Sequence, residues 1–291
     1  MEPLRDLNRA MEYIEEQLTG TIDFSQIERI AGCSEYHFRR MFSYISGINL
    51  SEYIRNRKLT VALDLLRDDS HRIIDIAIEL GYESPDSFAR AFQVMHGETP
   101  SMARKHLSDF SRFDPMTFRL TITGGMKMLV RIEEKEEFKI VGVHKQITLV
   151  HRGVNPQMNS MLSELTMERI LELKGMSDMT PKGIISVSTN FSEERAEGSM
   201  LDHYIGVATT LDVQEESWKI LAVPKYTWAV FTVVGKFPDA LQETWAKIYT
   251  EWFPSSEYQS VQGPEMLWHE SPDTSKHDYH SEIWIPVTRI Q

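Results

Sequence analysis

Several features are scarce or absent in this chain of 291 residues, and each absence argues against a class of protein. The single cysteine, Cys33, cannot form an internal disulfide, which fits a reducing cytoplasm better than an oxidising compartment. No run of eighteen apolar residues is present, so we expect no transmembrane helix and no membrane partner. The first ten residues, MEPLRDLNRA, carry charges where a signal peptide needs an apolar core. No glycine-rich nucleotide loop, Walker A motif or Ser-His-Asp signature appears, and we expect no cofactor.

An excess of basic residues is also missing. The formal net charge is −12, which argues against a nucleic-acid partner because nucleic-acid-binding domains are often basic. Binding, however, depends on where the charges lie rather than on their sum. Residues 1–112 hold 14 basic and 18 acidic residues, net −4, so most of the acidity, −8, belongs to the rest of the chain. This distribution favours a cationic or neutral ligand for the second part.

The length of the chain predicts two domains, and the hydrophobic periodicity changes where they would meet. Residues 1–107 have helical spacing throughout, residues 108–127 form a mixed linker with Pro115, and residues 128–291 are rich in β-branched and aromatic runs. The predicted helices lie at about 7–18, 24–31, 35–46, 51–67, 73–80, 85–96 and from 100 onward. The predicted strands are FKIVGVHKQI, GIISVSTNF, HYIGVATTL, YTWAVFTVVG and SEIWIPVTRI, with helices at about 157–174 and 238–252. The fold class is therefore an all-α domain followed by an α+β domain with its own internal duplication.

The helical part contains a repeat with an offset of fifty residues. The positions Ser34, Phe38, Arg40, Phe42 and Gly47 recur as Ser84, Phe88, Arg90, Phe92 and Gly97. Each unit consists of a short helix, a turn and a longer helix, and a helix of about 25 Å links the two units. Two helix-turn-helix units in one chain are a stronger signal for DNA binding than either unit alone.

In a helix-turn-helix, the second helix lies in the major groove, where arginine bonds guanine bidentately. The helical phase places four candidate DNA-binding residues on the outward side of the first unit: Tyr36, Arg39, Arg40 and Ser43. Asp86 and Arg90 hold corresponding places in the second unit, and Arg55, Arg57 and Lys58 form a basic cluster that suits phosphate. The alternative for each of them is an ordinary solvated helix face, which a single helix would favour and the repeat disfavours.

These residues resemble a known family. The stretches GCSEYHFRRMFSYISGINLSEYIRNRKLTVALDLL and IIDIAIELGYESPDSFARAFQVMHGETPSMAR resemble the DNA-binding domain of AraC/XylS-family transcription regulators over about residues 8–107. The resemblance implies that Tyr36, Arg39 and Arg40 read bases, and it places Asp86, Ser87 and Arg90 on the second reading helix. Asp86 departs from the neutral polar residue often found there, so the second helix is expected to bind DNA less tightly.

Residues 128–291 resemble the gyrase-inhibitor-like effector domain of Rob-type AraC proteins, through FKIVGVH, PKYTWAVFTVVG, TWAKIYTEWFPSSEY and SEIWIPV. The resemblance implies paired strand-helix-strand-strand modules around a cleft that binds small molecules, often lipophilic cations, and it gives Glu282 a functional role. Some relatives hydrolyse small reactive compounds.

The residues themselves support a ligand site at the last strand. Glu282 and Trp284 share one face of SEIWIPV, and Ile283 and Ile285 share the other. A carboxylate beside an indole is a good cation site. The alternation of side chains along the strands predicts that Tyr204, Trp228 and Trp268 also line this ligand site. The alternative is ordinary aromatic core for the rings and a surface salt bridge for Glu282.

Three functions remain open. The first is a transcription regulator that binds double-stranded promoter DNA and senses a small effector. The second is a regulator whose C-terminal domain docks a protein such as RNA polymerase. The third, a hydrolase using Glu282, lacks a second catalytic group, so we expect no enzyme. We also expect no metal site, because the spacing of the C-terminal histidines matches no zinc pattern. Both reading helices lie in one chain, so we expect a monomer or a weak dimer.

Overall fold

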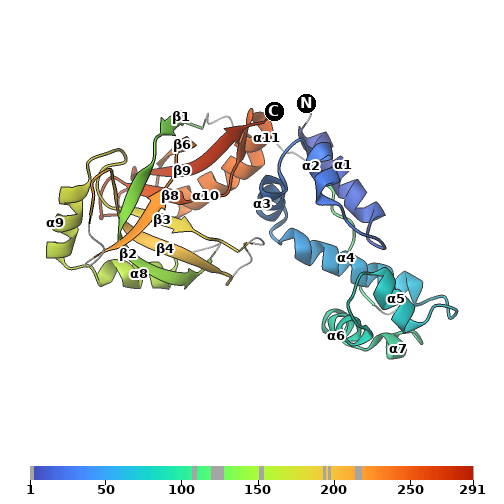
Figure 1. The fold of residues 1–291 in the computed structure, drawn as a ribbon. Coiled ribbons are helices and arrows are strands. Elements are labelled where there is room, and N and C mark those ends of the chain that lie inside the picture. The colour runs from blue at the N-terminus through green and yellow to red at the C-terminus, as the bar shows by residue number, and fades with distance from the viewer. Residues whose placement is uncertain are drawn as a thin grey trace. The chain divides into compact units, whose positions relative to one another are not determined.

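The computed structural model describes residues 3–106, 110–118, 128–150, 154–192, 195, 198–213 and 218–290. The chain divides into two compact units, Met1–Ile122 and Thr123–Gln291 (Figure 1). Of the predicted linker at 108–127, only residues 110–118 belong to the described part. Within the described residues, no helix has both the length and the apolar character needed to cross a membrane.

The first unit is helical, as its periodicity predicts. Its helices are α1 (Pro3–Glu16), α2 (Phe24–Ala31), α3 (Glu35–Ser46), α4 (Leu50–Leu65), α5 (Ile73–Glu79), α6 (Pro85–His96) and α7 (Pro100–Ala103). The linking helix α4 begins one residue before the predicted Ser51, because Asn49 is its N-cap: Asn49 Oδ1 accepts a hydrogen bond from the Glu52 amide at 2.7 Å.

The fifty-residue repeat is a structural repeat. Ser34 caps α3 and Ser84 caps α6, each accepting a hydrogen bond from a backbone amide of the first turn. Gly47 ends α3 and Gly97 ends α6, both in the left-handed region with φ of 78° and 83°, where glycine is favoured over other residues. Each helix is 12 residues long. The same local chemistry therefore starts and stops both helices.

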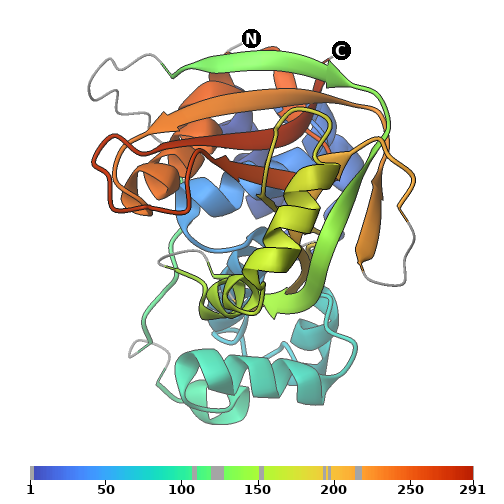
Figure 2. The same cartoon turned by 90° about the vertical axis from the view of Figure 1, so that its left-hand side faces the viewer.

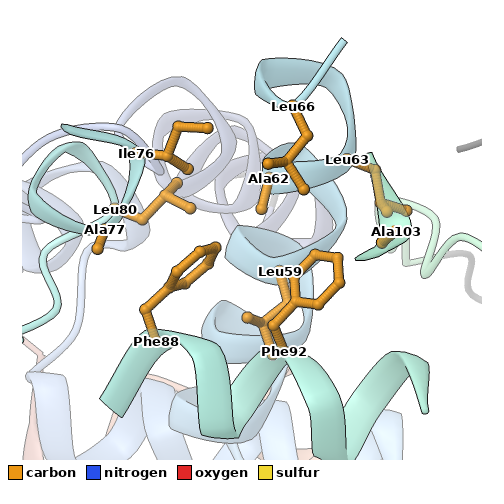
Figure 3. Packing of buried hydrophobic residues seen from close by; sticks show 10 residues of the cluster. All are labelled: Leu59, Ala62, Leu63, Leu66, Ile76, Ala77, Leu80, Phe88, Phe92 and Ala103. Carbon is orange, nitrogen blue, oxygen red and sulfur yellow. The ribbon is translucent and has the colours of Figure 1, made fainter. Parts of the chain in front are cut away.

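A single apolar cluster holds the second helix-turn-helix against the linking helix. Phe88 and Phe92 are fully buried and point from α6 toward Leu59 on α4, with Leu80, the C-cap of α5, beside Phe88 (Figure 3). The two phenylalanine rings lie 5.8 Å apart in an edge-to-face arrangement, a geometry that aromatic pairs favour.

Residues 110–118 run along the helical unit. The side chain of Asn8 on α1 pairs with both backbone groups of Phe118, at 3.0 and 2.8 Å. The Phe118 ring is 5.8 Å from that of Phe42, and the Phe113 amide donates to Thr60 Oγ1 at 3.1 Å. The described part of the predicted linker is thus packed against α1, α3 and α4.

The second unit is α+β. Its strands are β1 (Val130–Lys135), β2 (Phe138–Thr148), β3 (Ile185–Thr189), β4 (Met200–Thr209), β5 (Lys219–Val223), β6 (Tyr226–Val234), β7 (Tyr258–Ser260), β8 (Glu265–His269) and β9 (His280–Arg289). Its helices are α8 (Pro156–Ser163), α9 (Met167–Met176), α10 (Asp239–Lys247), the π-helical η2 (Ile248–Trp252) and α11 (Phe253–Ser255). The five predicted strands are present. The helix predicted at 157–174 is instead two helices, because Thr166 starts a new one by capping α9.

The strands form one antiparallel sheet whose order shows the predicted duplication. The order is β1-β6-β9-β8-β3-β4-β2-β5, with β7 added beside β9. One module, β2, β3 and β4 with α8 and α9, mirrors a second, β6, β8 and β9 with α10. The modules meet where β3 pairs with β8, and Figure 2 shows β1 (light green) beside β6 (orange) and β9 (red) at one edge.

The two faces of the sheet differ in what covers them. Helices α8 and α9 pack on β2 and β4 through a cluster that includes Val141, Leu173 and Val207. The opposite face carries a second cluster built from both modules, rich in aromatic side chains.

The strands β2 and β4 approach closely at Gly142 and Gly206, which are register partners. A Cβ on either glycine would lie 2.2 or 2.1 Å from a backbone oxygen of the other strand. This crossing therefore requires glycine on both strands.

Candidate functional site

The five predicted ligand residues lie on one face of the sheet. Across β6, β9 and β8, Val230, Trp284 and Met266 are register partners, and Glu282 pairs with Trp268. Directly paired residues of an antiparallel sheet share a face. Tyr204, Trp228, Trp268 and Trp284 all belong to or pack against the same cluster. Strand phase alone thus placed these side chains on a common surface.

The centre of this face is closed. Trp228 and Trp284 are fully buried, with ring centroids 6.2 Å apart in an edge-to-face arrangement. Trp268 and Tyr204 are half-buried, and the Trp268 indole donates to the Lys182 carbonyl at 2.8 Å. The indole nitrogen of Trp228 has no hydrogen-bond partner among the described residues. A buried donor without a partner is unusual in folded proteins.

Glu282 has a cationic partner within the chain. Arg131 on β1 donates to both carboxylate oxygens, from Nη1 at 2.8 Å and from Nη2 at 3.1 Å, and the Trp284 indole donates to Oε2 at 3.0 Å. The Glu282 side chain is 18 % exposed. All three described contacts donate hydrogen bonds to the Glu282 carboxylate.

The ion pair extends into a network on β1. Arg131 Nε also donates to Glu133 at 2.6 Å, and Lys135 pairs with Glu133 at 2.9 Å. The Glu282 carboxylate raises the pKa of the Arg131 guanidinium. Burial favours the neutral form of Glu133, but hydrogen bonds from Lys135 and Arg131 outweigh it and lower the pKa of that carboxyl. Two acidic and two basic side chains balance here, so Glu282 is ion-paired within the chain, which is the salt-bridge alternative given by the sequence.

A second polar group lies on the same face, on the other module. His144 Nε2 is 2.9 Å from Asp202 Oδ1, and Asn190 donates to the other oxygen at 2.7 Å. The His144 ring contacts that of Tyr204, with centroids 4.6 Å apart and the ring planes tilted by 35°. The hydrogen bond from Asn190, ahead of that from His144, outweighs partial burial and lowers the pKa of Asp202.

On α3, the predicted reading residues are engaged within the helical unit. Arg39 pairs with Glu35 at 2.7 Å, donates to Ser51 at 3.2 Å and lies 4.3 Å above the centroid of Phe24. Arg40 is 3 % exposed and donates to the Tyr36 hydroxyl at 3.5 Å. The predicted outward orientation therefore does not describe Arg40 in this structure.

The remaining α3 candidates are half-buried. Tyr36 is partly exposed beside Arg40, and the Ser43 hydroxyl donates back to the Arg39 carbonyl at 3.0 Å. This back-bond is a common arrangement for serine within a helix, and it leaves the lone pairs of the oxygen available.

On α6, the predicted residues are exposed. Asp86, Ser87 and Arg90 all lie on the solvent-facing side, and Arg90 has no ion pair among the described residues. Ser87 also has a structural role, because its hydroxyl and that of Ser84 bond each other's backbone in a capping box.

The basic cluster on α4 separates into three different environments. Arg55 is exposed, as phosphate binding needs. Arg57 is 8 % exposed and forms a bidentate pair with Glu15, at 2.7 to 3.0 Å, together with a bond to the Phe113 carbonyl. Lys58 donates to the Leu80 carbonyl at 2.8 Å, where α5 ends, and burial lowers its pKa. The prediction of a common phosphate site was therefore wrong for Arg57, which lies in the interior.

Comparison with known proteins places both units. A GyrI-like small molecule binding domain matches residues 128–288, and a helix-turn-helix domain matches residues 27–106. The HTH-type transcriptional activator AarP of Providencia stuartii is 34% identical over 103 residues, 35% of this chain and 75% of AarP. The regulatory protein SoxS of Salmonella typhimurium (strain LT2) is 35% identical over 97 residues, 33% of this chain and 91% of SoxS. The chain belongs to the AraC-type transcription regulators and carries a GyrI-like domain.

Among solved structures, this regulator is similar to SAV2435 bound to tetraphenylphosphonium. The likeness covers 56% of this chain and 94% of that one, with a TM-score of 0.44 and 16% identity.

Several residues near the candidate ligand site were not predicted from the sequence. Arg131, Glu133 and Lys135 were missed because β1 was not predicted, and with it the partner of Glu282. The alternation of Val130 and Ile132 with charged residues in VRIEEK was the available signal. His144 and Asp202 were missed because they come together only through the pairing of β2 with β4.

Proposed function

We propose that this regulator binds promoter DNA through α3 and α6, each lying in the major groove. The observation that supports this is the structural repeat: two helices of equal length, with equal caps, carried on one linking helix of about 24 Å. Successive major-groove faces on one side of DNA are about 34 Å apart, which the two helices can span. The contacts would come from Tyr36, Arg39, Arg40 and Ser43 on α3 and from Asp86, Ser87 and Arg90 on α6.

The arginines of the two helices differ in how accessible they are before DNA binds. Arg90 is already exposed, whereas Arg39 and Arg40 must exchange Glu35 and Tyr36 for phosphate oxygens or base edges. Arg55 adds a phosphate contact from α4. One chain supplies both helices, so the regulator would act as a monomer or a weak dimer, in the cytoplasm.

The test uses an operator selected by the full chain from random duplex DNA. Arg90→Ala should weaken binding by about 1–3 kcal/mol and relax the preference at one base position. Arg67→Ala, which removes a positive charge that is 61% exposed and lies beyond the end of α4, should leave the preference unchanged. If Arg90→Ala binds every sequence with unchanged rank and affinity, α6 does not read the operator.

We further propose that the GyrI-like domain of this regulator binds a lipophilic cation or a neutral aromatic effector on the aromatic face. Support comes from the convergence of Glu282, Trp284, Trp228, Trp268 and Tyr204 on one surface. The unpartnered indole N–H of Trp228 would suit an effector that carries a hydrogen-bond acceptor. Because the two central tryptophans are buried, the effector must bind a more open state of this face.

A thermal-shift screen tests the effector site. Tetraphenylphosphonium and triphenylphosphine oxide should each raise the melting temperature of the wild type, since a ligand that binds only the folded state stabilises it. Glu282→Gln should lose the shift with the cation and keep that with the neutral compound. Glu257→Gln is the matched control, because Glu257 pairs with Arg289 away from the aromatic face. No shift with either compound would remove the support for an effector of this class.

A second candidate is that this unit docks a protein partner such as RNA polymerase. The closed aromatic face favours it, since a packed face leaves no room for a ligand. Transcription reconstituted with purified polymerase and the selected operator separates the two: docking predicts activation by the full chain without any effector.

A further inference from the structure

Two cationic side chains of this unit, Arg131 and Lys135, lie where a cationic effector would bind, over the Trp284 ring and beside the Glu282 carboxylate. The guanidinium of Arg131 lies 5.4 Å from the ring centroid of Trp284, and the ammonium of Lys135 lies 5.5 Å from it. Both distances are within the range of cation–π attraction. The same guanidinium also binds the carboxylate beside that ring. The indole and the carboxylate are the two groups that make this strand a cation site, and Arg131 engages both.

All three nitrogens of the Arg131 guanidinium donate hydrogen bonds to carboxylates. Nη1 and Nη2 bind the two oxygens of Glu282, and Nε binds Glu133. A planar guanidinium matched to a carboxylate in this way is the strong form of ion pair. Register fixes the arrangement, because Arg131 pairs with Val230 and Val230 pairs with Trp284 across adjacent strands. The pairing of the strands therefore holds Arg131 beside Glu282 and Trp284.

A second group of an arginine, a glutamate and an aromatic ring in the same unit is exposed at the surface and can be compared with the group at Arg131. Arg289 makes one 3.3 Å contact with Glu257 and lies 5.8 Å from the centroid of Tyr258. Its side chain is 71% exposed, against 40% for Arg131, and Glu257 is 64% exposed, against 18% for Glu282. This group provides a matched control for any change made at Arg131.

We propose that Arg131 is a specificity-determining residue that competes with cationic effectors for Glu282 and Trp284. The inference rests on the effector site proposed above and concerns its regulation. A cation must displace the guanidinium to reach the carboxylate, whereas a neutral aromatic effector gains nothing from that displacement. Arg131 thereby sets the concentration at which a cation is sensed.

The size of the effect follows from occupancy. When the binding-competent state is only a fraction of the population, the apparent dissociation constant rises by the inverse of that fraction. If the guanidinium occupied this position about nine-tenths of the time, it would raise the apparent dissociation constant about tenfold. Removing the guanidinium should tighten cation binding by that factor.

The experiment is calorimetric titration of the full chain with tetraphenylphosphonium and, separately, with triphenylphosphine oxide. Arg131→Met should bind the cation about tenfold more tightly than the wild type, with neutral binding unchanged. Arg131→Lys keeps a positive charge and should stay near the wild type, and Arg289→Met should match the wild type for both compounds. Circular dichroism confirms that each variant is folded, and Arg131→Gln replaces Arg131→Met if the latter does not fold.

The outcomes separate the two proposals. Cation binding by Arg131→Met alone, or tighter binding by it, supports the competition. Equal cation affinity in the wild type and Arg131→Met overturns the role of Arg131 and leaves the effector site standing. Tighter binding by Arg289→Met to the same extent also overturns it, because the effect would then be one of net charge. If no variant binds either compound, the effector site itself fails and Arg131 has nothing to compete with.

Discussion

Replacing Arg57 by methionine tests whether this arginine stabilises the interior of the helical unit or contacts DNA. The change keeps most of the side-chain volume and removes the guanidinium, which makes three contacts with Glu15 and one with the Phe113 carbonyl. Among the described residues, Glu15 then keeps the Tyr53 hydroxyl, at 2.6 Å, as its one hydrogen-bond donor. Breaking a buried pair costs about 3–5 kcal/mol. The side chains of this pair are 10% and 20% exposed, so we expect the lower end, about 3 kcal/mol.

The assay has two readouts on the same protein. Thermal unfolding of the full chain, followed by far-ultraviolet circular dichroism, should show the helical unit melting about 12 °C lower, at about 4 °C per kcal/mol. The salt dependence of DNA binding should not change, because a buried arginine releases no counterion. Arg55→Met is the comparison: its stability should stay within about 0.5 kcal/mol and its salt slope should fall by about 1. An Arg57→Met variant that melts like the wild type and has the reduced slope would refute the reasoning.

Three further changes have expected outcomes. Gly206→Ala should destabilise the C-terminal unit by about 3 kcal/mol or more in urea unfolding, because its Cβ meets the backbone of β2; an effect below about 1 kcal/mol would contradict the close approach. Phe92→Ala should cost about 3–5 kcal/mol and Phe92→Leu much less, and equal losses would argue against a packed cluster around α6. Burial, helped by the charge of His144, lowers the pKa of His203 from 6.5 to about 4. Below pH 6.5 the unfolded chain therefore takes up a proton that the folded chain refuses, so stability falls as pH drops, by about 3 kcal/mol at pH 4. His203→Asn should flatten this part of the pH profile, and an unchanged profile would assign the acid sensitivity to other groups.

The helical unit could be predicted closely because its signals are local. A serine cap, a Phe-x-x-x-Phe pair and a terminal glycine each act within one or two turns, and their repetition at fifty residues strengthens each of these signals. The roles of its arginines could not be predicted in this way. Arg57 was predicted to contact phosphate, but its environment depends on Glu15, which is 42 residues earlier, and on residue 113, which is 56 residues later.

In the sheet, five strands were predicted, and the charged β1 and the short β5, β7 and β8 were not. The strands β5, β7 and β8 have five, three and five residues, too few for a clear alternation. The strand β3 also has five residues, but it lies within GIISVSTNF, a run rich in β-branched residues. The strand β1 alternates, but its charged residues are typical of a surface strand. Only the pairing of β1 with β6 brings Arg131 to Glu282, 151 residues away. Alternation along the strands predicted which face carries the candidate ligand residues. The charged partner of Glu282 could not be predicted, because it depends on strand pairing between distant parts of the chain.

The covalent link between the two helix-turn-helix units has a consequence for how the operator can change. In a symmetric dimer, one substitution alters both half-sites together, so the DNA must remain palindromic. Here α3 and α6 are separate copies that have already diverged, with Tyr36 and Arg39 on one and Asp86 and Ala89 on the other. If α3 and α6 read DNA as proposed, a single substitution would alter one half of the recognised sequence and leave the other as it was. A regulator built in this way can acquire new promoters one half at a time, and the direction in which its asymmetric site lies fixes which way the bound protein faces.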